Sequence, residues 1–313
     1  MVILDKIQVG EIQSFTQYVR NFTQQINQLS QVMSNVQSAV AASERVFEFL
    51  AIEEEVESPV NPLSIEGLKG NIEFQDVHFG YNPNKIIIKD FSAKVKDGQK
   101  IAIVGPTGAG KTTIVKLLMR FYELNSGKIL IDGKDMTQFD RHEIRSLFGM
   151  VLQDTWLFNG TIRDNVRYGK LEATDQEVRE ACKTASVDHF VKTLPDGYDM
   201  VLNEEADNIS GGQKQLLTIA RVILADPKIL ILDEATSSVD TRTEILIQQA
   251  MDKLMEGRTS FIIAHRLSTI KNADLILVMN EGDIVEQGNH EELLKKNGFY
   301  ANLYNSQFEV EEE

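Results

Sequence analysis

Residues 101–115 read IAIVGPTGAGKTTIV, and this stretch decides the fold of the chain. The solid apolar run IAIV is typical of a buried parallel strand, and TTIVKLLMRF, at 112–121, has the composition of a helix. Between them, residues 105–112 fit G-x-x-x-x-G-K-[ST], the pattern of a phosphate loop. A strand, this loop and a helix in that order predict an α/β fold with a phosphate-binding turn.

Each position of the loop has an expected task. Gly105, Gly108 and Gly110 allow backbone N–H groups to wrap a β-phosphate. Lys111 is expected to reach the β- and γ-phosphates, and the hydroxyl of Thr112 to ligate Mg²⁺. The cofactors expected here are therefore ATP and Mg²⁺, and the residues expected to contact the nucleotide are Gly105, Pro106, Thr107, Gly108, Ala109, Gly110, Lys111, Thr112 and Thr113.

Candidate catalytic residues follow other predicted strands. Asp233 ends the apolar run ILILD, where it can hold magnesium through water, and Glu234 comes next. A carboxylate near the γ-phosphate can deprotonate the attacking water, a role worth about 10²–10⁴-fold. His265 follows the run SFIIA and could contact the γ-phosphate or its water. Gln153, in MVLQD, could reach both the metal and the water.

Two further stretches suit a nucleotide. Tyr81, in FGYNPNK, could stack on adenine, an interaction worth about 1–3 kcal/mol. Residues 208–215 read NISGGQKQ, and LLTIARVIL follows at once. A serine and two glycines that open a helix are suited to hold a phosphate. The chain thus contains two phosphate-binding stretches, which calls for an explanation.

Residues 1–50 are predicted to contain one long helix. Its apolar positions alternate at spacings of three and four, which is a heptad seam: Ile12, Phe15, Val19, Phe22, Ile26, Leu29, Met33, Val36 and Val40. This seam rises about 42 Å, more than a bilayer core of about 30 Å. Arg20 is the only charge between Ile12 and Ser43. The pattern fits either a soluble coiled coil or a membrane helix that lines a watery pathway.

The remaining chain divides by composition. Residues 51–70 are acidic, contain two prolines and two glycines, and predict a linker. From 71 to 311, apolar and alternating strands interchange with helices, which predicts an α/β domain. Between Thr161 and Arg221 the strand signal disappears, so a helical subdomain is expected at about 155–225. Within it, TDQEVREACKTA opens with a Thr-x-x-Glu capping box.

Together these residues resemble the nucleotide-binding domain of ATP-binding cassette (ABC) transporters. The resemblance covers Tyr81, the phosphate loop, Gln153, ISGGQ, ILILDE, SSVD at 237–240 and His265, in the family's order. Ile209 departs from the usual LSGGQ. The family implies a phosphate-loop NTPase core, with a parallel sheet, an antiparallel β part and an α-helical subdomain.

The resemblance also explains the second glycine stretch. It implies a head-to-tail dimer in which the phosphate loop of one copy holds ATP and the other copy covers the γ-phosphate. The covering residues would be Ser210, Gly211, Gly212 and Gln213, at the positive end of a helix. Asp240 would belong to the dimer seam.

Residues 1–50 resemble the last transmembrane helix, with its cytoplasmic extension, of bacterial multidrug exporters of this family. This implies a fragment of a half-transporter, with one long N-terminal transmembrane-type helix. The expected location is the cell (inner) membrane, with the nucleotide-binding domain on the cytoplasmic face, and the expected function is ATP-driven export of drugs, lipids or peptides. The expected partner is a second half-transporter. VLNEEADN, before the signature, departs from the glutamate–glycine pattern common in homodimeric exporters and resembles one half of certain heterodimeric exporters. Those often have a damaged signature on that half, whereas ISGGQ is intact, so the partner is either an identical or a different chain.

Two alternatives come from other classes. A soluble ABC-type ATPase of DNA repair or chromosome organisation would place a very long coiled coil between the two loops, whereas here the insert is compact. The net charge of −15 also argues against nucleic acid as the partner, although it does not exclude a local basic groove. A non-hydrolysing regulatory cassette is disfavoured by the presence of both Glu234 and His265.

Overall fold

The computed structural model describes residues 8–52, 54–82, 84–152, 155–203, 206–233, 240–264 and 267–308. The chain divides into two compact units, Met1–Glu57 and Ser58–Glu313.

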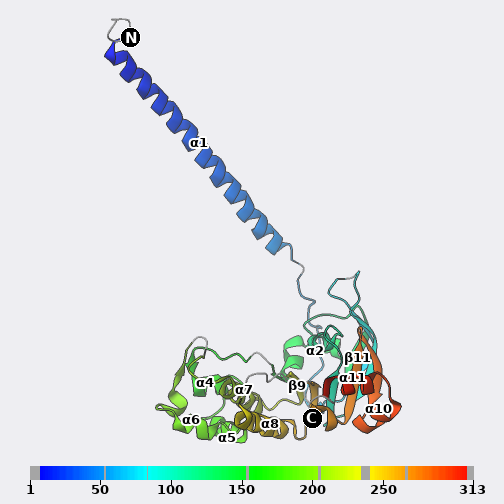
Figure 1. The fold of residues 1–313 in the computed structure, drawn as a ribbon. Helices are drawn as coiled ribbons and strands as arrows, with labels where there is room; N and C mark the ends of the chain where they lie inside the picture. The colour runs from blue at the N-terminus through cyan, green and yellow to red at the C-terminus, as the bar shows by residue number, and fades with distance from the viewer. Residues whose placement is uncertain are drawn as a thin grey trace. The chain divides into compact units, whose positions relative to one another are not determined.

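The first unit is built on one helix, α1 (Val9–Leu50), which runs without interruption (Figure 1). A capping box starts it, because the backbone N–H of Gln8 donates to the carboxylate of Glu11 at 2.9 Å. The expected long helix is therefore confirmed. Many polar side chains stand between the apolar residues of α1. In the part of the chain that the structure describes, no helix is both long and apolar enough to cross a membrane.

A six-stranded sheet forms the centre of the second unit, in the order β12-β11-β3-β10-β9-β6. Neighbouring strands in this sheet are parallel, except that β11 and β12 form an antiparallel hairpin. The central strands are the solid apolar runs of the sequence, and they are buried on both faces. The bounds are β3 (Lys100–Val104), β6 (Phe148–Val151), β9 (Ile229–Asp233), β10 (Thr259–Ile263), β11 (Leu275–Asn280) and β12 (Asp283–Gly288).

A second, antiparallel sheet has the order β2-β1-β4-β5. Its strands are β1 (Ile72–Phe79), β2 (Ile88–Val95), β4 (Ser126–Ile131) and β5 (Lys134–Asp135). Phe74 of β1 meets Phe91 of β2 edge-on, with ring centroids 5.0 Å apart, and also contacts Phe261 of the large sheet. These buried rings join the two sheets into one core.

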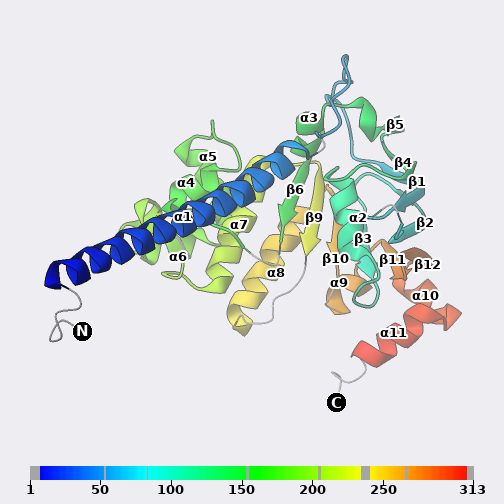
Figure 2. The same ribbon diagram turned by 90° about the horizontal axis from the view of Figure 1, so that it is seen from above.

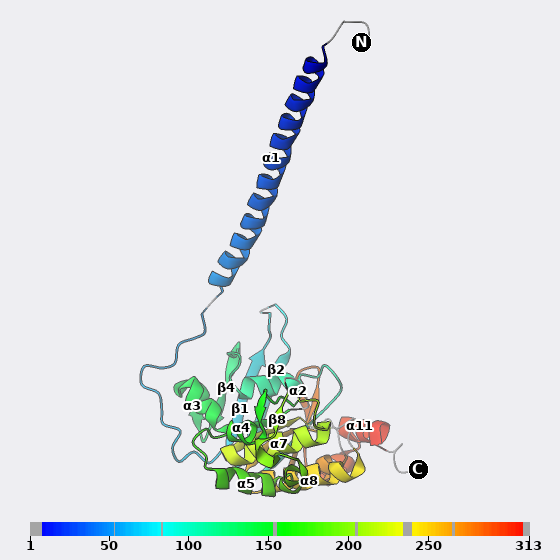
Figure 3. The same cartoon turned by 90° about the vertical axis from the view of Figure 1, so that its left-hand side faces the viewer.

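The helical subdomain lies beside β6, on the side away from the antiparallel sheet (Figure 2). It contains α4 (Ile162–Arg167), α5 (Asp175–Thr184), α6 (Asp188–Thr193), η3 (Gly197–Asp199) and α7 (Gly211–Ala225). Helices α4 and α5 pack on α7 (Figure 3). The capping box expected at Thr174 is present at the start of α5. One expectation is corrected: β7 (Gly160–Thr161) and β8 (Val201–Leu202) pair inside this insert, and two-residue strands are too short to show periodicity.

The remaining helices cover the sheets and complete the second unit. They are α2 (Lys111–Leu118), η2 (Met136–Gln138), α3 (Arg141–Ser146), α8 (Thr241–Met255), α9 (Leu267–Lys271), α10 (His290–Lys296) and α11 (Phe299–Phe308). Alternate residues of β3 face two different apolar clusters, Ala102 toward the helical side and Ile103 toward the antiparallel sheet. The phosphate loop therefore leaves a strand that is fixed from both faces.

Candidate functional site

The register of the large sheet gathers the candidate residues at one edge. Ile263 of β10 lies opposite Asp233 of β9 and opposite Ile103 of β3. The three parallel strands consequently end side by side, and the phosphate loop starts at the same edge, as is usual for ligand sites of open α/β sheets.

The phosphate loop has a backbone that only glycine suits. Gly105 and Gly110 adopt φ values of 150° and 101°. A Cβ atom on Gly105 would lie 2.2 Å from the carbonyl oxygen of Met279, so the loop could not close with any other residue. Gly110 is also the N-cap of α2 and offers that helix no side-chain cap. The first N–H groups of α2 therefore remain suited to an anion.

Lys111 points back into the loop. Its Nζ atom donates to the carbonyl oxygen of Gly105 at 2.7 Å and to that of Pro106 at 3.0 Å. Burial lowers the pKa of Lys111, and the charge of Asp233 opposes that shift. The site thus contains an amine whose charge is poorly solvated, which favours an anionic ligand.

A cavity of about 450 Å³ lies over the loop, within the size range of small-molecule sites. Thr112 and Asp233 line it together with Lys111. The described residues contain no cluster of three or more His, Cys, Asp or Glu side chains that could hold a metal ion. Mg²⁺ usually takes one or two protein oxygens and completes its shell with water and substrate phosphates, so the donors Thr112 and Asp233 fit that ion.

Tyr81 lies beside the phosphate loop. Its hydroxyl is 3.4 Å from Oγ1 of Thr113, and the Nζ atom of Lys116 lies 5.5 Å from its ring centroid. The rings of Phe79 and Tyr122 each meet it edge-on at 5.0 Å. The side chain is still 46% exposed, so its ring is accessible to a base. Lys116 and Tyr122 were missed by the sequence analysis; the one available signal was that Lys116 follows Lys111 on the same helix.

Ser210 caps α7 in a reciprocal capping box. Its Oγ atom accepts from the backbone N–H of Gln213 at 3.3 Å, and the side chain of Gln213 accepts from the N–H of Ser210 at 2.8 Å. Ser210 and Gly211 are exposed. Among the described residues that line the cavity over the phosphate loop, none comes from 210–213. The two glycine stretches therefore form separate surfaces of this chain.

The departure at Ile209 has a packing explanation. Ile209 is 7% exposed and belongs to the apolar cluster of the helical subdomain. Isoleucine conserves the volume of leucine, and such exchanges are well tolerated in a core.

The other candidates are less informative. Asp240 caps α8, where its carboxylate accepts from the N–H of Thr243 at 3.0 Å. Hydrogen bonds from the side chain of Thr243, and next from its backbone, lower the pKa of Asp240. Gln153, Glu234 and His265 lie outside the described residues.

Comparisons with known proteins agree with this architecture. Residues 88–237 match the family model described as ABC transporter. The chain is 53% identical over 303 residues to YfiC, an uncharacterized ABC transporter ATP-binding protein of Bacillus subtilis, covering 97% of this chain and 50% of the relative. It is 54% identical over 302 residues to a fatty acid ABC transporter ATP-binding/permease protein of Mycobacterium bovis, covering 96% of this chain and 48% of that protein.

A solved structure shares the fold. The structure of a bacterial Atm1-family ABC exporter with ATP bound matches with a TM-score of 0.78 and 38% identity, covering 97% of this chain and 53% of that one. The chain spans about half the length of the curated relatives it matches. With this fold, this level of identity and a matching family model, the chain belongs to the ABC transporter family and carries its ATP-binding domain.

Proposed function

We propose that this chain is the ATP-binding and ATP-hydrolysing part of an ABC exporter. The observation that carries the proposal is the cavity that Lys111, Thr112 and Asp233 line together at the carboxyl edge of the sheet. In it, a cationic amine, an uncapped helix start and a carboxylate lie where a triphosphate and its cation would bind. Mg²⁺ would neutralise phosphate charge there, held by Thr112, Asp233 and Gln153.

The remaining roles follow from this placement. Tyr81 stacks on the adenine, and the loop residues 105–113 hold the phosphates. Glu234 accepts a proton from the water that attacks the γ-phosphorus, and the bond to the bridging oxygen breaks. His265 and Gln153 contact the γ-phosphate or its water. Glu234 comes directly after Asp233 in the sequence, and Asp233, the last residue of β9, lines the cavity.

The assembly is a pair of half-transporters. Ser210, Gly211, Gly212 and Gln213 of one copy cover the ATP held by the other, and Asp240 lies in the seam. The exposure of Ser210 and Gly211, away from the chain's own cavity, supports this arrangement. The partner is a second half-transporter, the same chain or a related one.

Residues 1–50 belong to the C-terminal part of a membrane domain, residues 51–70 are a linker, and 71–311 form the nucleotide-binding domain. The alignment supports this layout, because the match to an ATP-binding/permease protein reaches over 96% of this chain. The assembly would reside in the cell membrane with the nucleotide-binding domain on the cytoplasmic face.

The test is a Glu234→Gln variant in the transporter assembled with its membrane half. It should bind ATP as the wild type does but lose nearly all turnover, by at least about 10²-fold. Glu256→Gln serves as the control, because Glu256 is an exposed carboxylate just after α8. Wild-type turnover in Glu234→Gln would refute the assignment.

A further inference from the structure

Tyr81 is held by an aromatic neighbour from another part of the chain. The ring of Tyr122, from the segment that follows α2, meets the ring of Tyr81 at a centroid distance of 5.0 Å and an angle of 81°. Tyr122 also contacts the buried ring of Phe79 at 5.5 Å. Because Phe79 is only 3% exposed, Tyr122 packs against a ring that belongs to the core. Edge-to-face pairs of this kind restrict the orientation of both rings.

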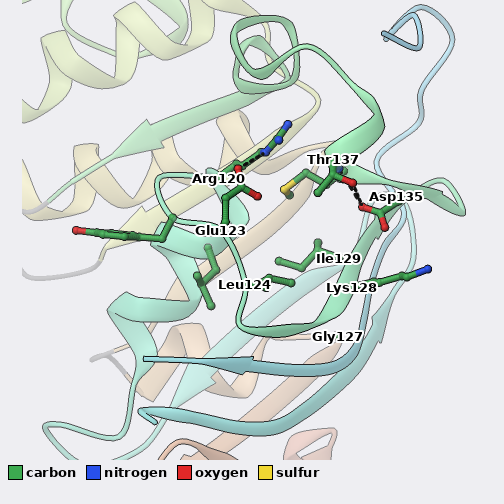
Figure 4. A pocket seen from close by; sticks show the side chains of 11 residues that line it. Arg120, Glu123, Leu124, Gly127, Lys128, Ile129, Asp135 and Thr137 are labelled. Atoms are coloured by element: carbon green, nitrogen blue, oxygen red, sulfur yellow. Dashed lines mark hydrogen bonds and ion pairs between the residues drawn. The ribbon is translucent and has the colours of Figure 1, made fainter. Parts of the chain in front are cut away.

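Before Tyr122 and directly after it, the segment is held by ion pairs between two buried arginines and the half-buried carboxylate of Glu123. Arg120 and Arg141 are 3% and 5% exposed, and both guanidinium groups contact one carboxylate, that of Glu123, at 3.0 and 2.5 Å. Figure 4 shows Arg120 and Glu123 bonded beside a cavity of about 140 Å³, which Tyr122 also lines. Arg145 adds a hydrogen bond from Nη2 to the carbonyl oxygen of Arg120 at 2.8 Å.

The other side of the segment is tied directly to the Tyr81 loop. The side-chain oxygen of Asn125 accepts from the backbone N–H of Gly80 at 2.8 Å, and the backbone N–H of Asn125 donates to the carbonyl oxygen of His78 at 3.0 Å. Gly80 is required there, since a Cβ atom would lie 2.2 Å from the carbonyl oxygen of Lys85. Hydrogen bonds therefore join the segment that carries Tyr122 to the segment that carries Tyr81.

We propose that Tyr122 is a positioning residue for the nucleotide base: it fixes the ring of Tyr81 in the orientation that stacks on adenine. The inference rests on the proposed role of Tyr81 in base stacking. Tyr122 is not among the described residues that line the cavity over the phosphate loop, so it acts through Tyr81. A ring that is already oriented loses less freedom on binding, so removing its support weakens binding of the base but leaves the phosphate contacts unchanged.

The experiment compares two ligands on the full 313-residue chain. ATP carries the base, whereas inorganic tripolyphosphate presents only the phosphates. Tyr122→Ala should weaken ATP binding about three- to tenfold, the range expected for loss of one aromatic pair. Tripolyphosphate binding should stay within about 1.5-fold, and in the assembled transporter KM for ATP should rise while kcat is retained.

Three further variants serve as controls. Tyr122→Phe should restore ATP binding, because the described structure gives the Tyr122 hydroxyl no hydrogen bond. Phe121→Ala should leave it unchanged: Phe121 is 47% exposed, much like Tyr122 at 43%, but its ring contacts Arg145. In a Tyr81→Ala background, Tyr122→Ala should add no further loss, since the two residues act as one unit. Tyr122→Leu replaces Tyr122→Ala if the latter does not fold, with the same expected result.

Each contrary result has a distinct meaning. If Tyr81→Ala weakens ATP binding and Tyr122→Ala does not, the positioning role is wrong and the role of Tyr81 stands. If Tyr122→Ala weakens tripolyphosphate as much as ATP, the residue acts on the phosphate loop and the inference is overturned. If Tyr81→Ala leaves ATP binding unchanged, base stacking and its support by Tyr122 both fail.

Discussion

The ammonium group of Lys111 is bound by the carbonyl oxygens of its own loop, at 2.7 Å from Gly105 and 3.0 Å from Pro106. Burial disfavours its charge, since the pKa of Lys111 is lowered. These carbonyls therefore satisfy two of the amine's hydrogen bonds within the loop itself. A triphosphate would offer stronger, charge-assisted contacts, so the loop is arranged to exchange one set of acceptors for another.

Lys111→Ala should weaken ATP binding about 10- to 100-fold, because hydrogen bonds to a charged group are worth about 1.5–3 kcal/mol. Titration of the variant with ATP and with tripolyphosphate should show similar losses, since the amine contacts phosphates only. Lys128→Ala is the matched control, because Lys128 is an exposed lysine on β4. If Lys111→Ala bound tripolyphosphate with unchanged affinity, Lys111 would not be a phosphate-binding residue.

Glu123→Ala should destabilise the second unit by about 3 kcal/mol. Its carboxylate is shared by the buried guanidinium groups of Arg120 and Arg141, and removing one partner of a buried ion pair leaves charge poorly compensated. Glu291→Ala is the control: the exposed Glu291–Lys295 pair is worth less than about 1 kcal/mol. Urea unfolding measures both. Equal small losses would mean that Glu123 contributes no more than a surface charge.

The carboxylate of Asp132 should make stability depend on acid pH. Burial raises its pKa, but hydrogen bonds from the Asn71 side chain and the backbone N–H groups of Lys69, Gly70 and Asn71 outweigh that effect and hold the pKa below 3.8. A lowered folded-state pKa gives stability that is complete above the unfolded-state value and disappears as the pH falls through the folded-state value.

Asp132→Asn should therefore cost about 1 kcal/mol at neutral pH, because the side chain is partly exposed and its bonds are in part replaced by water. Urea unfolding from neutral pH down to below the unfolded-state pKa should show the difference from wild type shrinking. A difference that stays constant with pH would show that the charge of Asp132 plays no part.

Much of the second unit could be predicted from the sequence because its strands are continuous apolar runs. IAIV, ILILD and SFIIA became β3, β9 and β10, and their parallel order follows from βαβ connections. The shared cavity of Lys111 and Asp233 was predictable on the same ground, since parallel strands end at one edge. The cap at Ser210 was predictable from local sequence, because a capping box involves residues three positions apart.

Contacts between distant segments were not predictable in this way. Tyr122 reaches Tyr81 only because β1 pairs with β4, which brings the ends of two separate loops together. Arg141 of α3 reaches Glu123 from 18 residues further along the chain, and an isolated arginine in a sequence carries no sign of burial. The spacing on α1 predicted a long helix, but heptad spacing alone did not show how far polar residues lower its mean hydropathy.

Ser210→Arg tests whether the phosphate loop and the stretch at 208–215 serve different nucleotides. In a Glu234→Gln fragment of residues 58–313, ATP with Mg²⁺ should produce a dimer with an identical copy or with the partner half. Light scattering should show that Ser210→Arg abolishes this dimer. Ser210→Ala controls for the lost helix cap, which is worth about 1 kcal/mol.

The most direct measurement is the affinity of the monomer for ATP in Ser210→Arg and in Lys111→Ala. We expect Ser210→Arg to bind ATP within about twofold of the parent, because changes at separate surfaces do not couple. Lys111→Ala should lose about 10- to 100-fold in the same titration. If Ser210→Arg lost as much affinity as Lys111→Ala, both stretches would serve one nucleotide within one chain, and the proposed arrangement would be contradicted.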